Sequence, residues 1–530
     1  MSHRVAFWVL VAAAGLLLLV RGGSVPLLDP DESRFARTSV EMLRSGDLVV
    51  PRFGGEPRLV KPPLVHWIQA SLFSLAGPQE WAARLHAAGA TLGSILLVGW
   101  LARRRFGPEG RLWAVAVFAT MPLVVVPGRV GTLDALLAVH VLAVVALDLV
   151  GEDGAGPYRS ICTGALLGLA FLVKGPVGVI LPLLVMLAGR TAAGRVVLPA
   201  PRSALRAMAA WAVVVLPWGL AFIRRVGADQ AVQTIRREVF ERYFAGTLHQ
   251  EPPWFFLIVG AVGFLPWLAP LLIGFVRAWR SRRDPVAEPA VYAAAGLLVG
   301  FLFFSLGRGK VASYVVPLAP LAALLVTWEL GREIEAPRER TLGPALVSAT
   351  LAACAVLLGL AGVPRLEGTA HAVAVAGTIY FAAGALVAAT GAVLRRPRWV
   401  YGAAAGATAV FLSACVLVLF PALGRTHSAA PLIEAVPALS AGRPLITVDV
   451  RVPSLTFYLD RPVEVLETAQ FDDRMAHDDR PLFVLVDVDL PAVPVEVVER
   501  LDEVGRYGKY VVLEKRQAVV SGPGSAKPDD

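Results

Sequence analysis

The sequence is poor in charge and in cysteine for a chain of 530 residues. Only 17% of its residues are charged, whereas soluble domains carry about a quarter, so an ordinary soluble enzyme is excluded. Its three cysteines, Cys162, Cys354 and Cys415, lie inside apolar runs without a Cys or His at metal-ligand spacing. Neither a disulfide framework nor a zinc site is therefore indicated. The chain also lacks a Gly-rich loop of the kind that cradles nucleotide phosphates.

Long apolar runs are abundant, since 56% of the residues are hydrophobic. Runs of about 20 apolar residues are typical of membrane-spanning helices. The first run follows Arg4 and reaches Val20; a secretory signal is the alternative, but no clear small-x-small cleavage site follows. Together with this run, thirteen spans are predicted, the others at about 84–102, 111–126, 133–150, 161–173, 175–189, 207–223, 254–276, 289–306, 311–328, 343–363, 370–394 and 398–420.

The basic residues predict the orientation of these spans. If Arg4 is cytoplasmic, every second connection should be rich in Arg and Lys, and groups such as Arg103–Arg105 and Arg395–Arg396 fit this pattern. The net charge of +9 therefore indicates membrane orientation rather than nucleic-acid binding. We expect a multi-pass protein of a bacterial inner membrane, with a cytoplasmic N-terminus and an extracytoplasmic C-terminus.

The domain organisation follows from these patterns. We expect a membrane domain over residues 1–425, with long outer loops at 22–83 and 224–253. Each loop contains an amphipathic helix suited to the membrane interface, one at Asp31–Leu43 and one between Val232 and Phe244. A small outer α/β domain is predicted over 428–516 and a disordered tail over 517–530. Its predicted elements are strands at Leu445–Val450, Leu455–Leu459, Val463–Leu466, Leu482–Val488 and Tyr510–Leu513 and a helix over 492–504.

Two motifs in the first outer loop carry candidate chemistry. The run Asp29-Pro30-Asp31-Glu32 places three carboxylates at the membrane edge, where they are solvated, paired or functional. A solvated helix cap is the simpler interpretation, and a base held at the helix start is the functional one. Lys61 precedes two prolines, which fix the backbone beneath a charged head suited to an anionic headgroup. Ordinary snorkelling is the alternative for this lysine.

Further polar residues are predicted at the outer ends of other spans. They are Asp134, Lys174, Arg242, His249, Arg308, Lys310 and Tyr314. For any one of them, a helix cap or an interfacial anchor is the commoner explanation. Because all are expected on the same side of the membrane, we predict one outward-facing cavity containing a few acids and several bases.

The ordered motifs resemble a known family of membrane enzymes. The stretches that carry the resemblance are Asp29-Pro-Asp-Glu-Ser-Arg-Phe-Ala36, Glu41-Met-Leu-Arg-Ser-Gly-Asp47, Lys61-Pro-Pro-Leu64, Thr132-Leu-Asp134, Phe171-Leu-Val-Lys-Gly-Pro176, His249-Gln-Glu-Pro-Pro-Trp-Phe-Phe256, Gly263-Phe-Leu-Pro-Trp267 and Phe304-Ser-Leu-Gly-Arg-Gly-Lys310. Over about residues 5–330 the chain is similar to the lipid A aminoarabinose transferases, which belong with the protein O-mannosyltransferases to the GT-C membrane glycosyltransferases. The resemblance is weak beyond residue 330.

The resemblance implies transfer of a sugar from a polyprenyl-phosphate donor, with inversion, on the extracytoplasmic face. The acceptor is a lipid A-like lipid, a wall glycan or a protein, and neither it nor the sugar follows from the sequence. The implied catalytic residues are Asp31, Glu32 and Asp134; Lys61, Lys174, Arg242 and Lys310 are the implied contacts of the donor phosphate; His249, Tyr314 and Arg308 line the substrate pocket.

A metal ion is not expected to be required. Relatives have a glutamate before the Lys-Pro-Pro motif that is associated with metal binding, whereas this chain has Val60. His249 and Glu32 are the residues that remain as metal-ligand candidates.

Two other functional classes suit a chain with many spans. A transporter or flippase of lipid-linked sugars would also have charged cavity residues, but it would carry them near the membrane midplane and show internal repeats. Here the charges cluster at span ends, and the two long outer loops are unlike each other. A cell-wall scaffold or receptor is a weaker alternative that rests on the outer domain.

Overall fold

The computed structural model of the chain consists of two compact units. Unit 1 comprises Met1–Val25 and Thr38–Pro421, and unit 2 comprises Pro26–Arg37 and Ala422–Asp530. The structure describes residues 2–151, 156–195, 198–238, 250–339, 341–363, 366–437, 439, 444–448, 451–461, 463–467, 470–471, 483–487, 501–507 and 510–515.

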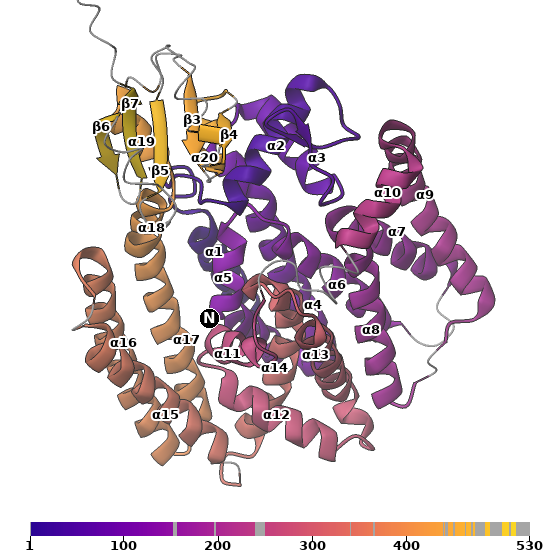
Figure 1. Cartoon of the computed structure of the whole chain (residues 1–530). Helices are drawn as coiled ribbons and strands as arrows, with labels where there is room; N and C mark the ends of the chain where they lie inside the picture. The colour runs from indigo at the N-terminus through magenta and orange to yellow at the C-terminus, as the bar shows by residue number, and fades with distance from the viewer. Residues whose placement is uncertain are drawn as a thin grey trace, which may run out of the picture. The chain divides into compact units, whose positions relative to one another are not determined.

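Unit 1 is almost entirely helical (Figure 1). Its first part contains α1 (His3–Leu19), α2 (Asp31–Ser45, which begins in unit 2), the hairpin β1 (Arg52–Phe53) and β2 (Glu56–Pro57), α3 (Leu64–Ala76), α4 (Glu80–Ala119), α5 (Pro122–Arg129), α6 (Asp134–Val150), α7 (Pro157–Lys174), α8 (Pro176–Ala192), α9 (Pro201–Val226) and α10 (Ala228–Ile235). After these come α11 (Phe255–Gly263), α12 (Leu268–Arg280), η2 (Pro285–Ala287), α13 (Glu288–Leu306), η3 (Ala312–Leu318), α14 (Ala319–Glu335), α15 (Leu342–Leu357), η4 (Leu358–Gly362), α16 (Gly368–Val393), α17 (Pro397–Ala414), η5 (Cys415–Leu419) and α18 (Phe420–Thr426, which ends in unit 2).

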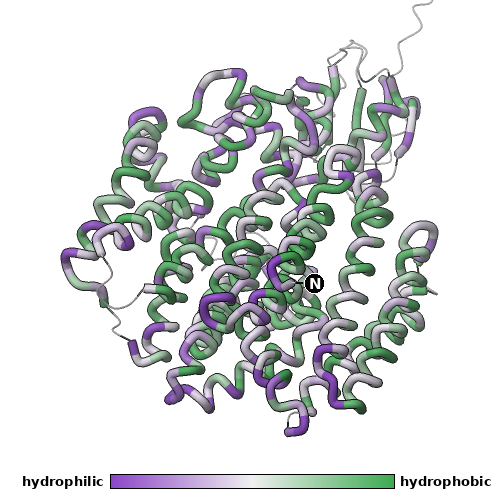
Figure 2. The backbone as a smooth tube through the Cα atoms, turned by 180° about the vertical axis from the view of Figure 1, so that it is seen from behind, coloured by the Kyte–Doolittle hydropathy of each residue, from purple (hydrophilic) through white to green (hydrophobic). Residues whose placement is uncertain are grey.

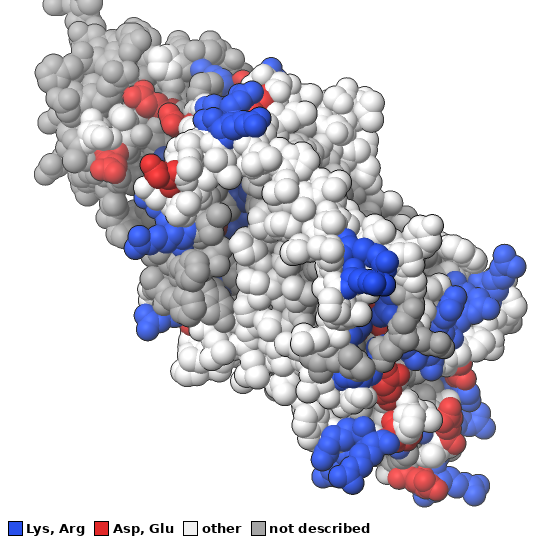
Figure 3. Space-filling view, turned by 90° about the vertical axis from the view of Figure 1, so that its right-hand side faces the viewer, with Lys and Arg blue, Asp and Glu red and all other residues white. Residues whose placement is uncertain are grey.

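Many of these helices suit a membrane. Within the described ranges, seven helical stretches are long and apolar enough to cross one, and the bent pair α11–α12 would make an eighth. Hydrophobic residues run along the helices, whereas hydrophilic residues collect near the turns (Figure 2). On the face seen in Figure 3, Lys and Arg side chains gather in groups with a broad uncharged surface between them. The chain is therefore a polytopic helical membrane protein, as the sequence predicted.

Each predicted span falls on helical structure, although several of these helices are short. Helices α1 and α6 have 17 residues each, so the total of thirteen crossings stays a prediction. The predicted spans at 84–102 and 111–126 fall on α4 and α5. Helix α4 is interrupted at Gly107, whose φ of 76° is left-handed, and Pro108 follows it. Glycine permits that conformation and proline cannot continue the earlier hydrogen-bond ladder, so the two residues separate the two halves of α4.

The helices of unit 1 pack in neighbouring groups. Helix α4 contacts α1, α6 and α14; α13 contacts α8 and α14; and α15, α16 and α17 lie side by side (Figure 1). Helices α7 and α9 approach closely because Gly164 and Gly168 face α9. A Cβ atom at Gly164 would lie 2.0 Å from the carbonyl oxygen of Ala207. Small residues allow such close contacts between membrane helices.

Unit 2 contains a five-stranded mixed sheet. Its helices are α19 (Ala430–Ala435) and α20 (Pro453–Tyr458), and its strands are β3 (Leu445–Val448), β4 (Glu464–Leu466), β5 (Phe483–Asp487), β6 (Leu501–Tyr507) and β7 (Tyr510–Lys515). The strand order is β4-β3-β5-β7-β6; β3 runs parallel to β4 and β5, and β7 runs antiparallel to β5 and β6. Successive residues Leu445 and Ile446 enter two different hydrophobic clusters, because alternate strand side chains point to opposite faces.

One prediction for this region is wrong, and another is wrong in the part that the structure describes. Residues Leu455–Leu459, predicted as a strand, lie mostly in helix α20. A short apolar run fits either structure, and Pro453 at the start of α20 favours the helix. A helix was predicted over 492–504, but its last residues, 501–504, lie in strand β6, which pairs with β7. Tertiary pairing therefore outweighs the local pattern there; residues 492–500 lie outside the described residues.

Candidate active site

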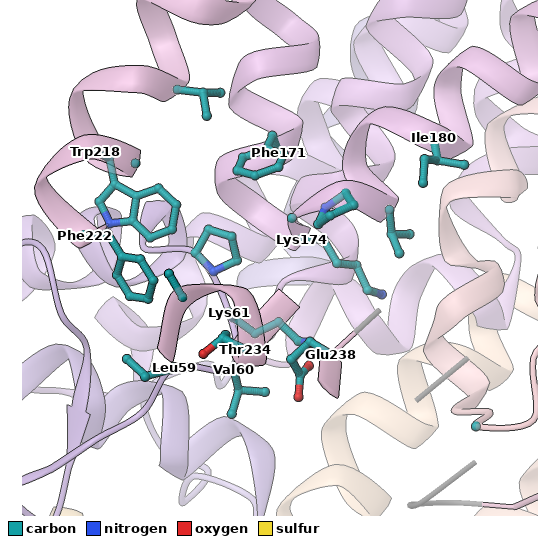
Figure 4. A pocket seen from close by; sticks show the side chains of 18 of the residues that line it. Leu59, Val60, Lys61, Phe171, Lys174, Ile180, Trp218, Phe222, Thr234 and Glu238 are labelled. Atoms are coloured by element: carbon teal, nitrogen blue, oxygen red, sulfur yellow. Dashed lines mark hydrogen bonds and ion pairs between the residues drawn. The ribbon is translucent and has the colours of Figure 1, made fainter. Parts of the chain in front are cut away.

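Unit 1 contains a cavity of about 530 Å3. Its walls come from α7 to α10, the end of α13, η3 and the segment before α3 (Figure 4). Among the described residues that line it, five carry a charge or a hydroxyl group: Lys61, Lys174, Thr234, Glu238 and Tyr314. The other lining residues are apolar or aromatic, and Trp218, Phe222 and Phe171 are the largest aromatic groups in the view of Figure 4. A mostly apolar cavity with a few polar groups is typical of a ligand site.

Lys61 enters this cavity from the segment between β2 and α3. Pro62 and Pro63 follow it, and they restrict the backbone that carries the lysine. The Lys61 ammonium lies 2.7 Å from a carboxylate oxygen of Glu238. The two side chains are only 18% and 24% exposed, so solvent screens this ion pair less than a surface pair.

Lys174 enters from the junction of α7 and α8. It is the last residue of α7, and Gly175, with a φ of 63°, turns the chain into α8. Its ammonium lies 2.5 Å from a carboxylate oxygen of Asp134, the first residue of α6. Each charge has the sign that its helix end favours, because helix N-termini attract anions and C-termini attract cations. The Lys174 ammonium also lies 4.3 Å from the centre of the Tyr314 ring, within reach of a cation–π interaction.

The predicted residues around 308–310 have different surroundings. Lys310 is buried and donates a hydrogen bond of 2.8 Å to the carbonyl oxygen of Glu251. Arg308 is exposed. Neither side chain lines the cavity, although Gly307 and Gly309 do. Of the three predicted residues Arg308, Lys310 and Tyr314, only Tyr314 therefore lines the cavity together with Lys61 and Lys174.

The three carboxylates near α2 have unequal surroundings within unit 2. Asp29 accepts hydrogen bonds from the Ser454 amide at 2.8 Å and from the hydroxyl groups of Ser33 and Ser454. Burial raises the pKa of the Asp29 carboxyl, and these hydrogen bonds oppose the rise. Glu32 is buried and accepts a hydrogen bond of 2.9 Å from the Leu28 amide.

Asp31 is the accessible carboxylate of this group. Its side chain is 60% exposed, and it lies 3.4 Å from Arg34. A solvent-accessible carboxylate at the start of a helix can accept a proton. Asp31 and Lys61 belong to different units, and their convergence on one substrate stays a prediction.

Within its described ranges, the chain shows no group of residues that matches a metal site. Arg242 and His249 lie outside the described residues. In the part of the chain that the structure describes, no three His, Cys, Asp or Glu side chains are grouped so that they could hold a metal ion. Val60 lines the cavity beside Lys61 and offers no ligand atom, and Glu32 is occupied by the Leu28 amide.

Sequence reasoning missed Glu238 and the aromatic wall. Glu238 belongs to the amphipathic stretch that was predicted, but nothing in the sequence pairs it with Lys61, 177 positions away. Trp218 and Phe222 are four residues apart on α9, which places them on one helix face. That spacing could have predicted an aromatic face on this helix.

Lysines in an apolar cavity suit a ligand with an anionic group and a long apolar part. The ammonium groups of Lys61 and Lys174 can donate charge-assisted hydrogen bonds to an anion. The aromatic and aliphatic walls can cover hydrocarbon. The cavity therefore fits the phosphate end of a lipid better than a fully hydrophilic ligand.

Comparisons with known proteins identify the relatives of this chain. Residues 60–220 match the family model of dolichyl-phosphate-mannose-protein mannosyltransferases. The chain is 32% identical over 398 residues to an undecaprenyl phosphate-alpha-4-amino-4-deoxy-L-arabinose arabinosyl transferase of Edwardsiella ictaluri, covering 71% of this chain and 70% of that protein. A protein of the same name from Aeromonas salmonicida is 32% identical over 310 residues, which span 57% of this chain and 55% of the relative.

A solved structure shares the fold over nearly the full length. The crystal structure of ArnT from Cupriavidus metallidurans bound to undecaprenyl phosphate matches with a TM-score of 0.79 and 24% identity, covering 98% of this chain and 99% of that one. The match extends past residue 330, where the sequence resemblance is weak, and so includes the C-terminal unit.

Proposed function

This chain belongs to the family of undecaprenyl phosphate-aminoarabinose arabinosyl transferases, and on that premise we propose that it transfers an amino sugar from a polyprenyl-phosphate donor to a lipid acceptor. The predicted membership in the GT-C membrane glycosyltransferases is thereby confirmed. We propose a pentosyl group as the sugar, a lipid A-like glycolipid as the acceptor and the extracytoplasmic face as the site of transfer.

The observation that carries this proposal is the cavity with two lysines in apolar walls. Lys61 and Lys174 both line it, and each faces a carboxylate at 2.5 to 2.7 Å. A polyprenyl-phosphate donor offers the matching chemistry, since its phosphate is anionic and its lipid is hydrocarbon. Donor binding would place the phosphate at the lysines and the first part of the lipid against Trp218 and Phe222.

The proposed reaction is a displacement at the anomeric carbon. The acceptor hydroxyl oxygen forms a bond to that carbon while the carbon–oxygen bond to the donor phosphate breaks, so polyprenyl phosphate leaves with the electron pair. Attack from the opposite face inverts the anomeric configuration. Asp31 would take the hydroxyl proton as general base.

Lys61 and Lys174 would stabilise the negative charge that develops on the departing phosphate. Loss of one such donor costs about 2.7–4 kcal/mol of transition-state stabilisation in comparable anion holes. We assign Asp134 a positioning role, because it already lies 2.5 Å from Lys174. Four further residues remain proposed substrate contacts. Two of them, Arg308 and Lys310, do not line the cavity. The other two, Arg242 and His249, lie outside the described residues. The described residues do not fit a metal ion, and no step is assigned to one.

Product analysis tests the function. The purified full-length chain in liposomes is incubated with a polyprenyl-phosphate amino sugar and a lipid A acceptor, and free polyprenyl phosphate and glycosylated acceptor are measured by mass spectrometry. We expect both products, with undiminished rates after chelator treatment. Movement of intact donor across the bilayer without release of polyprenyl phosphate would instead identify a flippase.

A further inference from the structure

Glu238 is an acidic group in a cavity that is otherwise arranged for an anion. Among the described lining residues, it is the one carboxylate, and it lies 2.7 Å from Lys61. Figure 4 shows both side chains at the same end of the cavity, near Thr234. A fixed negative charge at this position repels a bound phosphate, whatever it contributes to positioning Lys61.

Donor binding changes the charge balance around this pair. When the donor phosphate pairs with the Lys61 ammonium, the ion pair between Lys61 and Glu238 is weakened. The carboxylate and the phosphate would then repel each other across a poorly screened space. A donor that brings its own cation removes this conflict: its phosphate pairs with Lys61, and its ammonium group pairs with Glu238.

We propose that Glu238 binds the amino group of the donor sugar and thereby selects amino sugars over neutral sugars. This inference rests on the function proposed above and extends it by assigning a specificity-determining residue. The ion pair between Lys61 and Glu238 is exchanged for two ion pairs with the ligand. A donor with a neutral sugar can form only the ion pair between its phosphate and Lys61. The partly buried Glu238 carboxylate then has less positive charge beside it, which costs binding free energy.

The surroundings of Glu238 suit contact with a sugar. Thr234 lies four residues earlier, just before the end of α10, and also lines the cavity. Its hydroxyl donates a hydrogen bond of 2.8 Å to the Gln230 carbonyl oxygen and can accept one from a sugar hydroxyl group. A phosphate at Lys61 leaves the attached sugar within a few bonds of Glu238. The phosphate, the hydroxyl groups and the amine of one donor could therefore be bound by Lys61, Thr234 and Glu238.

Two donors that differ only in the amine test the inference. The full-length chain is given a polyprenyl-phosphate amino pentose and its counterpart with a hydroxyl in place of the amine. Binding of each donor is measured by displacement of labelled polyprenyl phosphate, and kcat/KM is measured for each. The variants are Glu238→Gln and, as the matched control, Asp229→Asn, which removes an exposed carboxylate from α10, the helix that precedes Glu238.

We expect the unmodified chain and Asp229→Asn to prefer the amino donor by about tenfold or more, the scale of one charge-assisted hydrogen bond. In Glu238→Gln this preference should largely disappear. Polyprenyl phosphate itself should bind the variant at least as tightly, because Lys61 is relieved of its carboxylate partner; this readout also establishes that the variant folds.

Two results overturn the inference. One is an undiminished preference for the amino donor in Glu238→Gln. The other is an equal loss of both donors together with loss of polyprenyl phosphate binding, which would make Glu238 a structural support for Lys61. The binding measurement needs no turnover, so it decides the role of Glu238 even if the chain transfers neither sugar and the proposed function fails.

Discussion

At the residue scale, neighbouring carboxylates acquire different tasks from their surroundings. Asp29 and Glu32 are held by hydrogen-bond donors of unit 2, including the Ser454 and Leu28 amides. Asp31, between them in the sequence, projects a side chain that is 60% exposed. Fixing the two flanking acids immobilises the start of α2, which is a useful property for a base that must meet a hydroxyl group at a defined angle.

The Asp31→Asn variant tests this division of roles. An amide cannot accept the acceptor proton, so we expect transfer to fall by about 100-fold or more. Membrane insertion and binding of polyprenyl phosphate should be unchanged. The control is Glu56→Gln, which alters an exposed acid in the same outer segment. Wild-type turnover in Asp31→Asn would remove this residue from the role of base.

The burial of Asp29 predicts that the stability of the fold decreases as the pH rises above the acidic range. Burial raises the pKa of its carboxyl in the folded state, so the folded chain binds this proton more tightly than the unfolded chain does. Ionisation of Asp29 therefore costs stability as the pH rises through the folded pKa, and the cost disappears as the pH falls to the unfolded pKa of about 3.9.

The Asp29→Asn variant carries no such titration. We expect its thermal midpoint, relative to that of the unmodified chain, to improve as the pH is raised from about 4 to neutrality. Thermal unfolding of both proteins in detergent over this range measures the difference. A difference that stays constant, or that shifts in the opposite direction, contradicts the assignment.

At the element scale, α6 is tied to the α7–α8 hairpin at both of its ends. Asp134 at its start pairs with Lys174. Near its other end, buried Asp148 lies 2.5 Å from Arg190 of α8 and 3.1 Å from Arg159 of α7, and it accepts a hydrogen bond of 2.9 Å from the Tyr292 hydroxyl. The contacts of Asp148 hold together α6, α7 and α8, the helices that position Lys174, although Asp148 does not line the cavity.

The Asp148→Asn variant should therefore destabilise unit 1. Removing one member of a buried ion pair leaves charge uncompensated and costs about 3–5 kcal/mol. Glu109→Gln is the control, because its partner Arg398 is 62% exposed and surface pairs contribute at most about 1 kcal/mol. Unfolding by denaturant in detergent compares the variants. Equal effects of the two substitutions would show that the Asp148 contacts are unimportant for stability.

Helices were easier to predict from the sequence than the contacts between them. Continuous apolar runs predict membrane helices, and the amphipathic period of Asp31–Leu43 predicts an interfacial helix. Helices lie at these predicted positions. Short apolar segments such as Leu455–Leu459 carry no such period. The pairing of Lys61 with Glu238 joins residues 177 positions apart and depends on tertiary packing, which leaves no local pattern.

At the scale of the whole molecule, the predicted orientation depends on the distribution of basic residues. In a cysteine-free background, the variants Ser281→Cys and Glu503→Cys place one thiol in a predicted cytoplasmic connection and one in unit 2. We expect a membrane-impermeant maleimide to label Glu503→Cys in intact spheroplasts and Ser281→Cys only after lysis. The reverse pattern would place the catalytic face inside the cell.

The central claim is that the donor phosphate binds between Lys61 and Lys174, with its lipid against the aromatic wall of α9. A polyprenyl phosphate with a photoreactive group on its first isoprene unit tests this directly, when crosslinked peptides are identified by mass spectrometry. We predict adducts on the α9 peptide that contains Trp218 and Phe222, competed by unlabelled polyprenyl phosphate. Competable adducts confined to the α15–α17 group would contradict the account.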